Sequence, residues 1–172
     1  MKAVKTGLLA LSLGLATSLS AQAFTVELGD PAWDGQKIPA GMQCQKFGGE
    51  QPRSPALMLS DIPADTNLIM FEYSDRSFAP MDNGGHGRFG FALNVPVEKV
   101  WVEHVPGHSF ELPKGFFLIE PHRNPSWDIA GAYMPPCSGG RNNEYYVTVT
   151  AVKFDGESME KLATQVLELG RY

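Results

Sequence analysis

The sequence LIMFEYSDRSFAPMDNGGHGRFGFALNVP, residues 68–96, decides the fold class and supplies the candidate site. Residues 68–73 and 89–95 are predicted strands, because they are rich in apolar and aromatic residues and the second alternates with a period of two. The loop between these strands is polar, with carboxylate, imidazole and guanidinium groups. Its charged and titratable residues are Asp75, Arg76, Asp82, His86 and Arg88.

Glycines stand on both sides of the histidine in this loop. Gly84, Gly85 and Gly87 allow the backbone to adopt positive φ and to approach a ligand closely around His86. A carboxylate such as Asp75, an imidazole and guanidinium groups on a glycine-rich rim therefore predict a small polar pocket. An ordinary solvated loop is the alternative that these residues alone leave open.

The N-terminus has the pattern of a secretory signal peptide. Lys2 and Lys5 precede an apolar run over residues 7–19, and Ala21-Gln22-Ala23 supplies small residues for cleavage. The run is shorter than the ~20 residues that a membrane-spanning helix needs. We therefore expect residues 1–23 to be removed, leaving a single domain over residues 24–172 in a periplasmic or secreted protein without an integral membrane segment.

Composition narrows the class of protein and its partners. The formal net charge is -5, and the predicted loss of Lys2 and Lys5 makes the mature chain more acidic still. No run of lysine and arginine offers a track for a phosphate backbone, so nucleic acid is not an expected partner. Glycine, proline and β-branched residues are plentiful, and this favours a mostly β fold.

The chain has two cysteines, Cys44 and Cys137. Two cysteines in an oxidising, exported compartment are candidates for one disulfide. Two buried free thiols are the alternative, because the sequence does not show whether the two Cα atoms come within bridging distance.

Other stretches predict strands and one helix. Residues 24–28, 56–59 and 145–152 have strand patterns. The last stretch predicts an amphipathic helix lying across the sheet, because apolar residues follow i, i+3, i+7 and i+10 from residue 159 to residue 169. Asp155 or Ser158 would cap its start. The residues of the predicted apolar stripe are Met159, Leu162, Val166 and Leu169.

Several short motifs occur in an order typical of one protein family. They are KIPA at 37–40 with Cys44 after it, SPAL at 54–57, IPADT at 62–66, YMPP at 133–136 and NEY at 143–145. Because of the order of these motifs, the chain resembles the phosphatidylethanolamine-binding protein family, most closely its bacterial, Raf-kinase-inhibitor-like branch. The resemblance implies a large antiparallel sheet, a smaller sheet and a C-terminal helix beside a small pocket that binds phosphate or phospholipid head groups.

The chain departs from this family at the pocket. Asp75 alone stands where the family has two aspartates, and Phe89 stands where the family has its pocket histidine, three residues after His86. Asn143 and Glu144 replace a histidine and an arginine. The loop and the resemblance together give these candidate ligand-binding residues: Asp75, His86, Arg88, Tyr133, Pro135, Pro136 and Tyr145.

The sequence thus predicts an exported protein that binds a small anion, such as phosphate or a phospholipid head group. Catalysis is not expected, because no Gly-x-Ser-x-Gly elbow is present, and the histidines lack the spacing of metal ligands. No cofactor is expected. Protonation of His86 below pH ~6.5 should strengthen anion binding, with Arg76 and Arg88 supplying positive charge. The alternative is an interaction module, resembling protease or kinase inhibitors, with a degenerate pocket.

Overall fold

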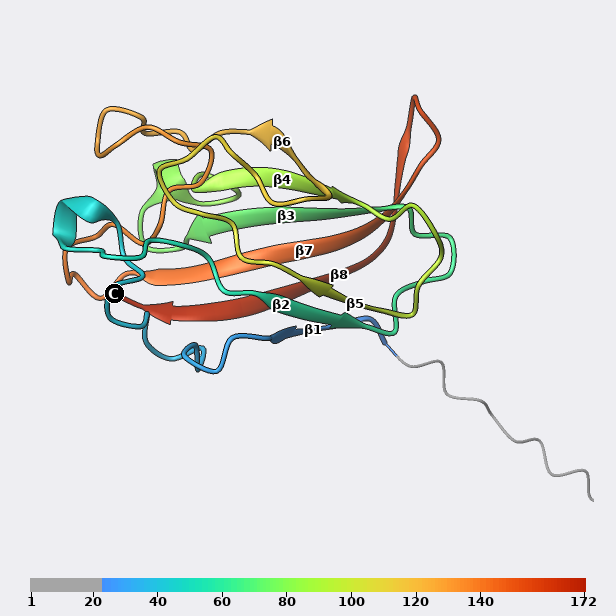
Figure 1. Cartoon of the computed structure of the whole chain (residues 1–172), viewed down its shortest axis with the longest axis horizontal. Helices are drawn as coiled ribbons and strands as arrows, with labels where there is room; N and C mark the ends of the chain where they lie inside the picture. The colour runs from blue at the N-terminus through green and yellow to red at the C-terminus, as the bar shows by residue number, and fades with distance from the viewer. Residues whose placement is uncertain (1–22) are drawn as a thin grey trace, which may run out of the picture.

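Two antiparallel sheets make up the fold in the computed structural model, which describes residues 23–172 (Figure 1). The larger sheet has the strand order β6-β4-β3-β7-β8, and the smaller one has the order β1-β2-β5. The predicted signal peptide lies almost wholly outside the described residues. The mostly β class and the pairing of a large with a small sheet are confirmed.

In the central stretch the strands lie where the sequence predicts them. No strand was predicted for the two segments that form β5 and β6. Their bounds are β1 (Thr25–Leu28), β2 (Leu57–Ser60), β3 (Leu68–Asp75), β4 (Gly87–Ala92), β5 (Lys99–Val102), β6 (Phe116–Glu120), β7 (Glu144–Phe154) and β8 (Met159–Arg171). Two short 3-10 turns, η1 (Gln45–Phe47) and η2 (Ala79–Met81), lie in the loops.

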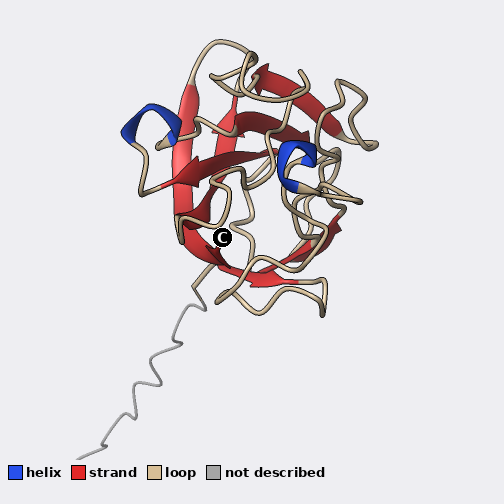
Figure 2. Ribbon diagram, turned by 90° about the vertical axis from the view of Figure 1, so that its left-hand side faces the viewer, coloured by secondary structure: helices blue, strands red, loops and turns tan. Residues whose placement is uncertain are grey.

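The hydrophobic core lies between the two sheets, whose strands curve around it in the end view of Figure 2. Phe71 of β3 and Val149 of β7 point inward from the large sheet, and Leu57 and Leu59 of β2 come from the small one. All four are at most 1% exposed. Burying a side chain of this kind contributes roughly 1.5–3 kcal/mol relative to leaving it exposed.

The helix predicted for the C-terminal stretch is wrong, because this stretch is β8 and pairs with β7 along its whole length. Met159 and Val166 of the predicted stripe are 56% and 49% exposed. Ala163, Leu167 and Leu169 pack on the core instead, at a period of two. Pairing with a long neighbouring strand therefore overrides the helix-forming residues of this segment.

Cys44 and Cys137 form a disulfide, as one of the two alternatives predicted, with their Cα atoms 5.2 Å apart. The bridge ties the loop at η1 to the loop that precedes β7. It is consistent with an oxidising, extracytoplasmic location. Within residues 23–172, no helix has the length and apolar character needed to cross a membrane.

Candidate functional site

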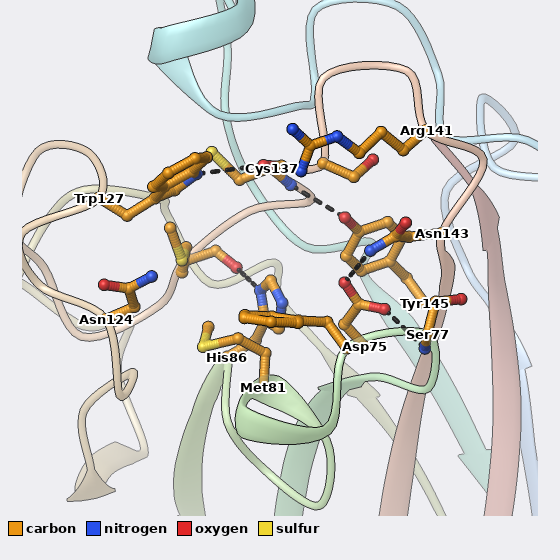
Figure 3. Close-up of a pocket in the computed structure, with 13 residues that line it drawn as sticks. Asp75, Ser77, Met81, His86, Asn124, Trp127, Cys137, Arg141, Asn143 and Tyr145 are labelled. Atoms are coloured by element: carbon orange, nitrogen blue, oxygen red, sulfur yellow. Dashed lines mark hydrogen bonds between the residues drawn. The ribbon is translucent and has the colours of Figure 1, made fainter.

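A cavity of about 280 Å³ opens at the end of the large sheet, where β3 ends and β7 begins (Figure 3). Loops after β3, after β6 and before β7 complete its wall. The residues that line it are Asp75, Ser77, Phe78, Met81, His86, Asn124, Trp127, Met134, Cys137, Ser138, Arg141, Asn143 and Tyr145.

Asp75, the last residue of β3, is fixed in the cavity wall. Its Oδ2 accepts a hydrogen bond from Asn143 Nδ2 (2.6 Å), and its Oδ1 accepts one from the backbone amide of Ser77 (2.9 Å). The residue is only 3% exposed, and burial raises the pKa of its carboxyl group against the lowering effect of these hydrogen bonds. Asp75 therefore orients Asn143 and the loop after β3.

His86 is a neutral imidazole in the same wall. Its Nδ1 lies 2.7 Å from the carbonyl oxygen of Met134, and since a carbonyl only accepts, Nδ1 carries the hydrogen. Burial lowers the pKa of His86 to about 4. Nε2, which makes no hydrogen bond to residues 23–172, is thus left as an acceptor. The ring stands edge-on to Tyr145, with centroids 5.4 Å apart.

Tyr145 contributes a hydroxyl group from the start of β7. Its oxygen accepts a hydrogen bond from the backbone amide of Cys137 at 3.2 Å (Figure 3). Burial raises the pKa of this phenol well above its usual range, so the group stays protonated and can donate. Asp75, His86 and Tyr145 therefore line one cavity with an acid, an acceptor nitrogen and a hydroxyl group.

Arg141 is the site residue that sequence reasoning missed. Its side chain extends along the cavity rim in Figure 3 and makes no ion pair or hydrogen bond with the rest of residues 23–172. It is the guanidinium that lines the cavity. The sequence offered only a weak signal, an arginine in the turn between the Pro-Pro loop and β7.

The two arginines expected to supply positive charge lie elsewhere. Arg88 pairs through Nε with Glu72 (2.9 Å) and through Nη1 with Glu120 (3.0 Å) on the outer face of the large sheet. Arg76 pairs with Glu168 at 2.7 Å and lies over the ring of Tyr146. Carboxylates therefore compensate both charges, and neither residue lines the cavity.

The glycine loop does not present free amides to a ligand. The amides of Gly84 and Gly87 donate to Ser74 Oγ and to the carbonyl of Gly84, and the amide of His86 donates to the carbonyl of Tyr73. This loop positions the His86 ring at the start of β4. It does not itself form an anion-binding nest.

Tyr133, Pro135 and Pro136 are buried and do not line the cavity. The ring of Tyr133 packs on Tyr73 in the core, with centroids 4.9 Å apart. Phe89 is fully buried in the same core and does not fill the cavity. Of the seven candidate ligand-binding residues, the structure brings Asp75, His86 and Tyr145 together.

One side of the cavity is apolar. Phe78, Met81, Trp127 and Met134 form it. Trp127 donates from Nε1 to the carbonyl oxygen of Cys137 (3.2 Å), and Lys46 Nζ lies 3.7 Å from the centre of the indole ring. These contacts hold the indole in place beside the polar residues.

No protein-family model and no curated protein matches the chain. Solved structures are similar to it, among them the following two. A phosphatidylethanolamine-binding protein homologue from Chlamydia trachomatis is 19% identical over 87% of this chain and 97% of its own, with a TM-score of 0.50. YbcL of E. coli, described as a member of the mammalian phosphatidylethanolamine-binding protein family, is 20% identical over 88% and 98%, with a TM-score of 0.54.

These likenesses define the class of fold. The chain has the fold of the phosphatidylethanolamine-binding proteins, as the order of its sequence motifs predicts. The fold alone does not define a function, and a lined cavity at one end of the sheet is the kind of feature at which small ligands bind.

Proposed function

We propose that the protein is exported and binds, without catalysis, a small ligand carrying a phosphate-like anionic group in this cavity. The observation that carries the proposal is the guanidinium of Arg141, which lines the cavity and has no carboxylate partner within residues 23–172. A guanidinium without a partner is a strong recognition group for phosphate and carboxylate.

The hydrogen-bonding groups of the cavity fit an anion that keeps a proton. Arg141 and the hydroxyl of Tyr145 can donate to anion oxygens, whereas His86 Nε2 can only accept. A hydrogen phosphate or a singly protonated phosphate ester offers both kinds of partner. Asp75 contributes by fixing Asn143, since a bare carboxylate would repel the ligand.

The apolar side supports a ligand larger than the anion alone. Phe78, Met81 and Trp127 lie next to the polar residues in a cavity of about 280 Å³. This surface can hold the organic part of a phosphate ester against aromatic and thioether groups. We therefore expect phosphoethanolamine to bind more tightly than inorganic phosphate.

Calorimetric titration of the mature protein with inorganic phosphate and with phosphoethanolamine tests the proposal. The substitution Arg141→Gln should weaken binding of both by about 10- to 100-fold, the effect of losing a hydrogen bond to a charged group. Lys161→Gln is the matched control, because Lys161 pairs with Val152 at the far end of β7 from Tyr145. Equal affinities of wild type and Arg141→Gln would remove Arg141 from the site.

An interaction module is the second candidate, and the edge strand β6 favours it. Phe117, Leu118 and Ile119 are consecutive, and each is at least 37% exposed on a strand that has a neighbour on one side only. Exposed apolar edges of this kind mark interaction surfaces. Failure of both phosphate ligands to bind the wild type would make this the preferred function.

A further inference from the structure

A second group of polar side chains surrounds the disulfide. The two sulfur atoms of Cys44 and Cys137 and a carboxylate oxygen of Asp128 all lie within 4.8 Å of one another. The cysteines are 0% and 7% exposed, and the side chain of Asp128 is 8% exposed. A disulfide has no hydrogen to donate, so it does nothing to offset the cost of burying this carboxylate.

An imidazole adjoins the same carboxylate. His108 Nε2 lies 3.3 Å from Asp128 Oδ2, and the His108 side chain is 3% exposed. Two ligands of a tetrahedral Zn²⁺ lie roughly 3.4 Å apart when Zn–N and Zn–O distances are about 2.1 Å. His108 Nδ1 also lies 2.9 Å from the carbonyl oxygen of Ile129, the contact by which metal-binding histidines are oriented.

Contacts other than the disulfide hold these segments together. Cys44 donates its amide to the carbonyl of Pro136 (3.0 Å), and Lys46 donates its amide to Asp128 Oδ2 (3.1 Å). Trp127 donates to the carbonyl of Cys137. Opening the disulfide therefore leaves two thiols and a carboxylate close together, with the His108 imidazole beside the carboxylate. His108 Nε2 accepts a hydrogen bond from the backbone amide of Gln45 (3.2 Å), which a bound cation would replace.

We propose that the dithiol form of the protein binds one thiophilic divalent cation of the Zn²⁺ class through Cys44, Cys137, Asp128 and His108. A dithiol or phosphine reductant supplies two electrons to the disulfide, which takes up two protons and becomes two thiols. The cation then displaces both thiol protons and is held by two thiolates, a carboxylate and an imidazole. Disulfide and cation are thus alternative links between the same two segments, and one of their residues, Cys137, also belongs to the wall of the ligand cavity.

The site is tested by titrating Co²⁺ into the full mature protein after a phosphine has reduced the disulfide in the absence of oxygen. The reduced protein should bind one Co²⁺ with thiolate-to-metal absorption, Zn²⁺ should displace it, and the oxidised protein should show no such absorption. Asp128→Asn should weaken Co²⁺ binding by at least about tenfold. Glu111→Gln, an exposed acid on a nearby loop, is the matched control and should bind as the wild type does.

Two results would overturn the proposal. One is Co²⁺ binding by reduced Asp128→Asn as tight as by reduced wild type, because two thiols alone would then account for it. The other is the absence of thiolate absorption in reduced wild type that keeps its far-ultraviolet circular dichroism. If reduction unfolds the protein, one equivalent of Zn²⁺ should restore the folded spectrum, and failure to do so counts equally against the site.

Discussion

His86 shows how its surroundings change the chemistry of a residue that the sequence singles out. Its pKa, expected near 6.5 from the sequence, is lowered to about 4 because the ring is buried, and this outweighs the raising effect of the hydrogen bond from Nδ1 to the carbonyl oxygen of Met134. Ligand affinity should therefore not rise through this residue as pH falls from 8 to 5.5. The neutral ring instead offers Nε2 to a donor on the ligand.

The same shift predicts a pH dependence of stability. Because the pKa of His86 is about 4 when folded and about 6.5 when unfolded, the unfolded chain binds more protons between these values. The free energy of unfolding should fall by about 3 kcal/mol from this residue as pH drops from 6.5 to 4. Urea unfolding of wild type and His86→Gln at pH 7.5 and 4.5 measures it.

The substitution should reduce the loss of stability on acidification, although buried His122, whose pKa burial also lowers, will leave part of it. Between pH 7.5 and 8.5 the imidazole is neutral in both states, so wild type and variant should show the same slope there. Identical acid sensitivity in the two proteins would contradict a neutral, buried His86.

Three cavity residues, Asp75, His86 and Tyr145, were predictable because a strand end, a glycine loop and a family motif mark them. Arg141 was not, because an arginine in a turn resembles any solvated arginine. Arg88 was expected in the site, but β4 places it between Glu72 of β3 and Glu120 of β6. Its two partners come from other strands, and this pairing is not visible in the local sequence.

The hairpin of β7 and β8 shows that one local signal can serve two structures. Asp155 was a candidate helix cap. Its Oδ1 accepts hydrogen bonds from the amides of Glu157 (2.9 Å) and Ser158 (2.7 Å), but the turn that it closes joins two strands. These bonds lower the pKa of Asp155 to about 2. A capping side chain such as that of Asp155 therefore indicates a turn. Whether a helix or a strand follows this turn depends on the strand with which the next segment pairs.

Gly85 lets the turn η2 pack against the loop that carries His86. A Cβ atom here would lie 2.3 Å from the Cα of Met81 and 2.4 Å from its carbonyl carbon. Backbone atoms cannot move aside without shifting η2, so Gly85→Ala should lower the free energy of unfolding by about 1–3 kcal/mol. Because Met81 and His86 line the cavity, ligand affinity should fall as well.

Gly90→Ala on β4 is the matched control for Gly85→Ala. Its Cβ would also meet an atom closely, at 2.1 Å, but that atom is Cζ of Phe117, a side chain 44% exposed that can turn away. Urea unfolding should therefore show a smaller loss for Gly90→Ala than for Gly85→Ala. A loss as large for Gly90→Ala would mean that backbone contact at η2 is not what makes Gly85 necessary.

Features of the whole molecule could be predicted where the order of sequence motifs or the number of cysteines indicates them. The mostly β class, the two sheets and the disulfide could be predicted in this way, whereas β6 and the strand character of β8 could not. Both are edge strands of the large sheet: β6 pairs with β4, which is distant in sequence, whereas β8 pairs with β7, its neighbour along the chain. Residues 116–119 form an apolar run without alternation, and β8 has helix-forming residues, so neither has a local strand pattern.

The disulfide should be the largest single constraint on the unfolded chain, since its cysteines are 93 residues apart. In the chain-entropy model a loop of this length contributes about 4–5 kcal/mol. Folded domains are stable by about 5–15 kcal/mol, and the hydrogen bonds from Cys44 to Pro136 and from Trp127 to Cys137 do not involve the bridging sulfur atoms. The reduced protein should therefore stay folded but unfold at much lower urea concentration.

Urea unfolding of oxidised wild type, reduced wild type and the double variant Cys44→Ala with Cys137→Ala measures this contribution. With a metal chelator present, the last two should both lose about 4–5 kcal/mol and agree with each other. Added Zn²⁺ should then return part of the loss to reduced wild type alone, because the double variant has no thiols to bind it. If the free energy of unfolding of the double variant lies within about 1 kcal/mol of that of oxidised wild type, the bridge constrains the unfolded chain little. The packing around Cys44 and Cys137 would then hold the two loops by itself.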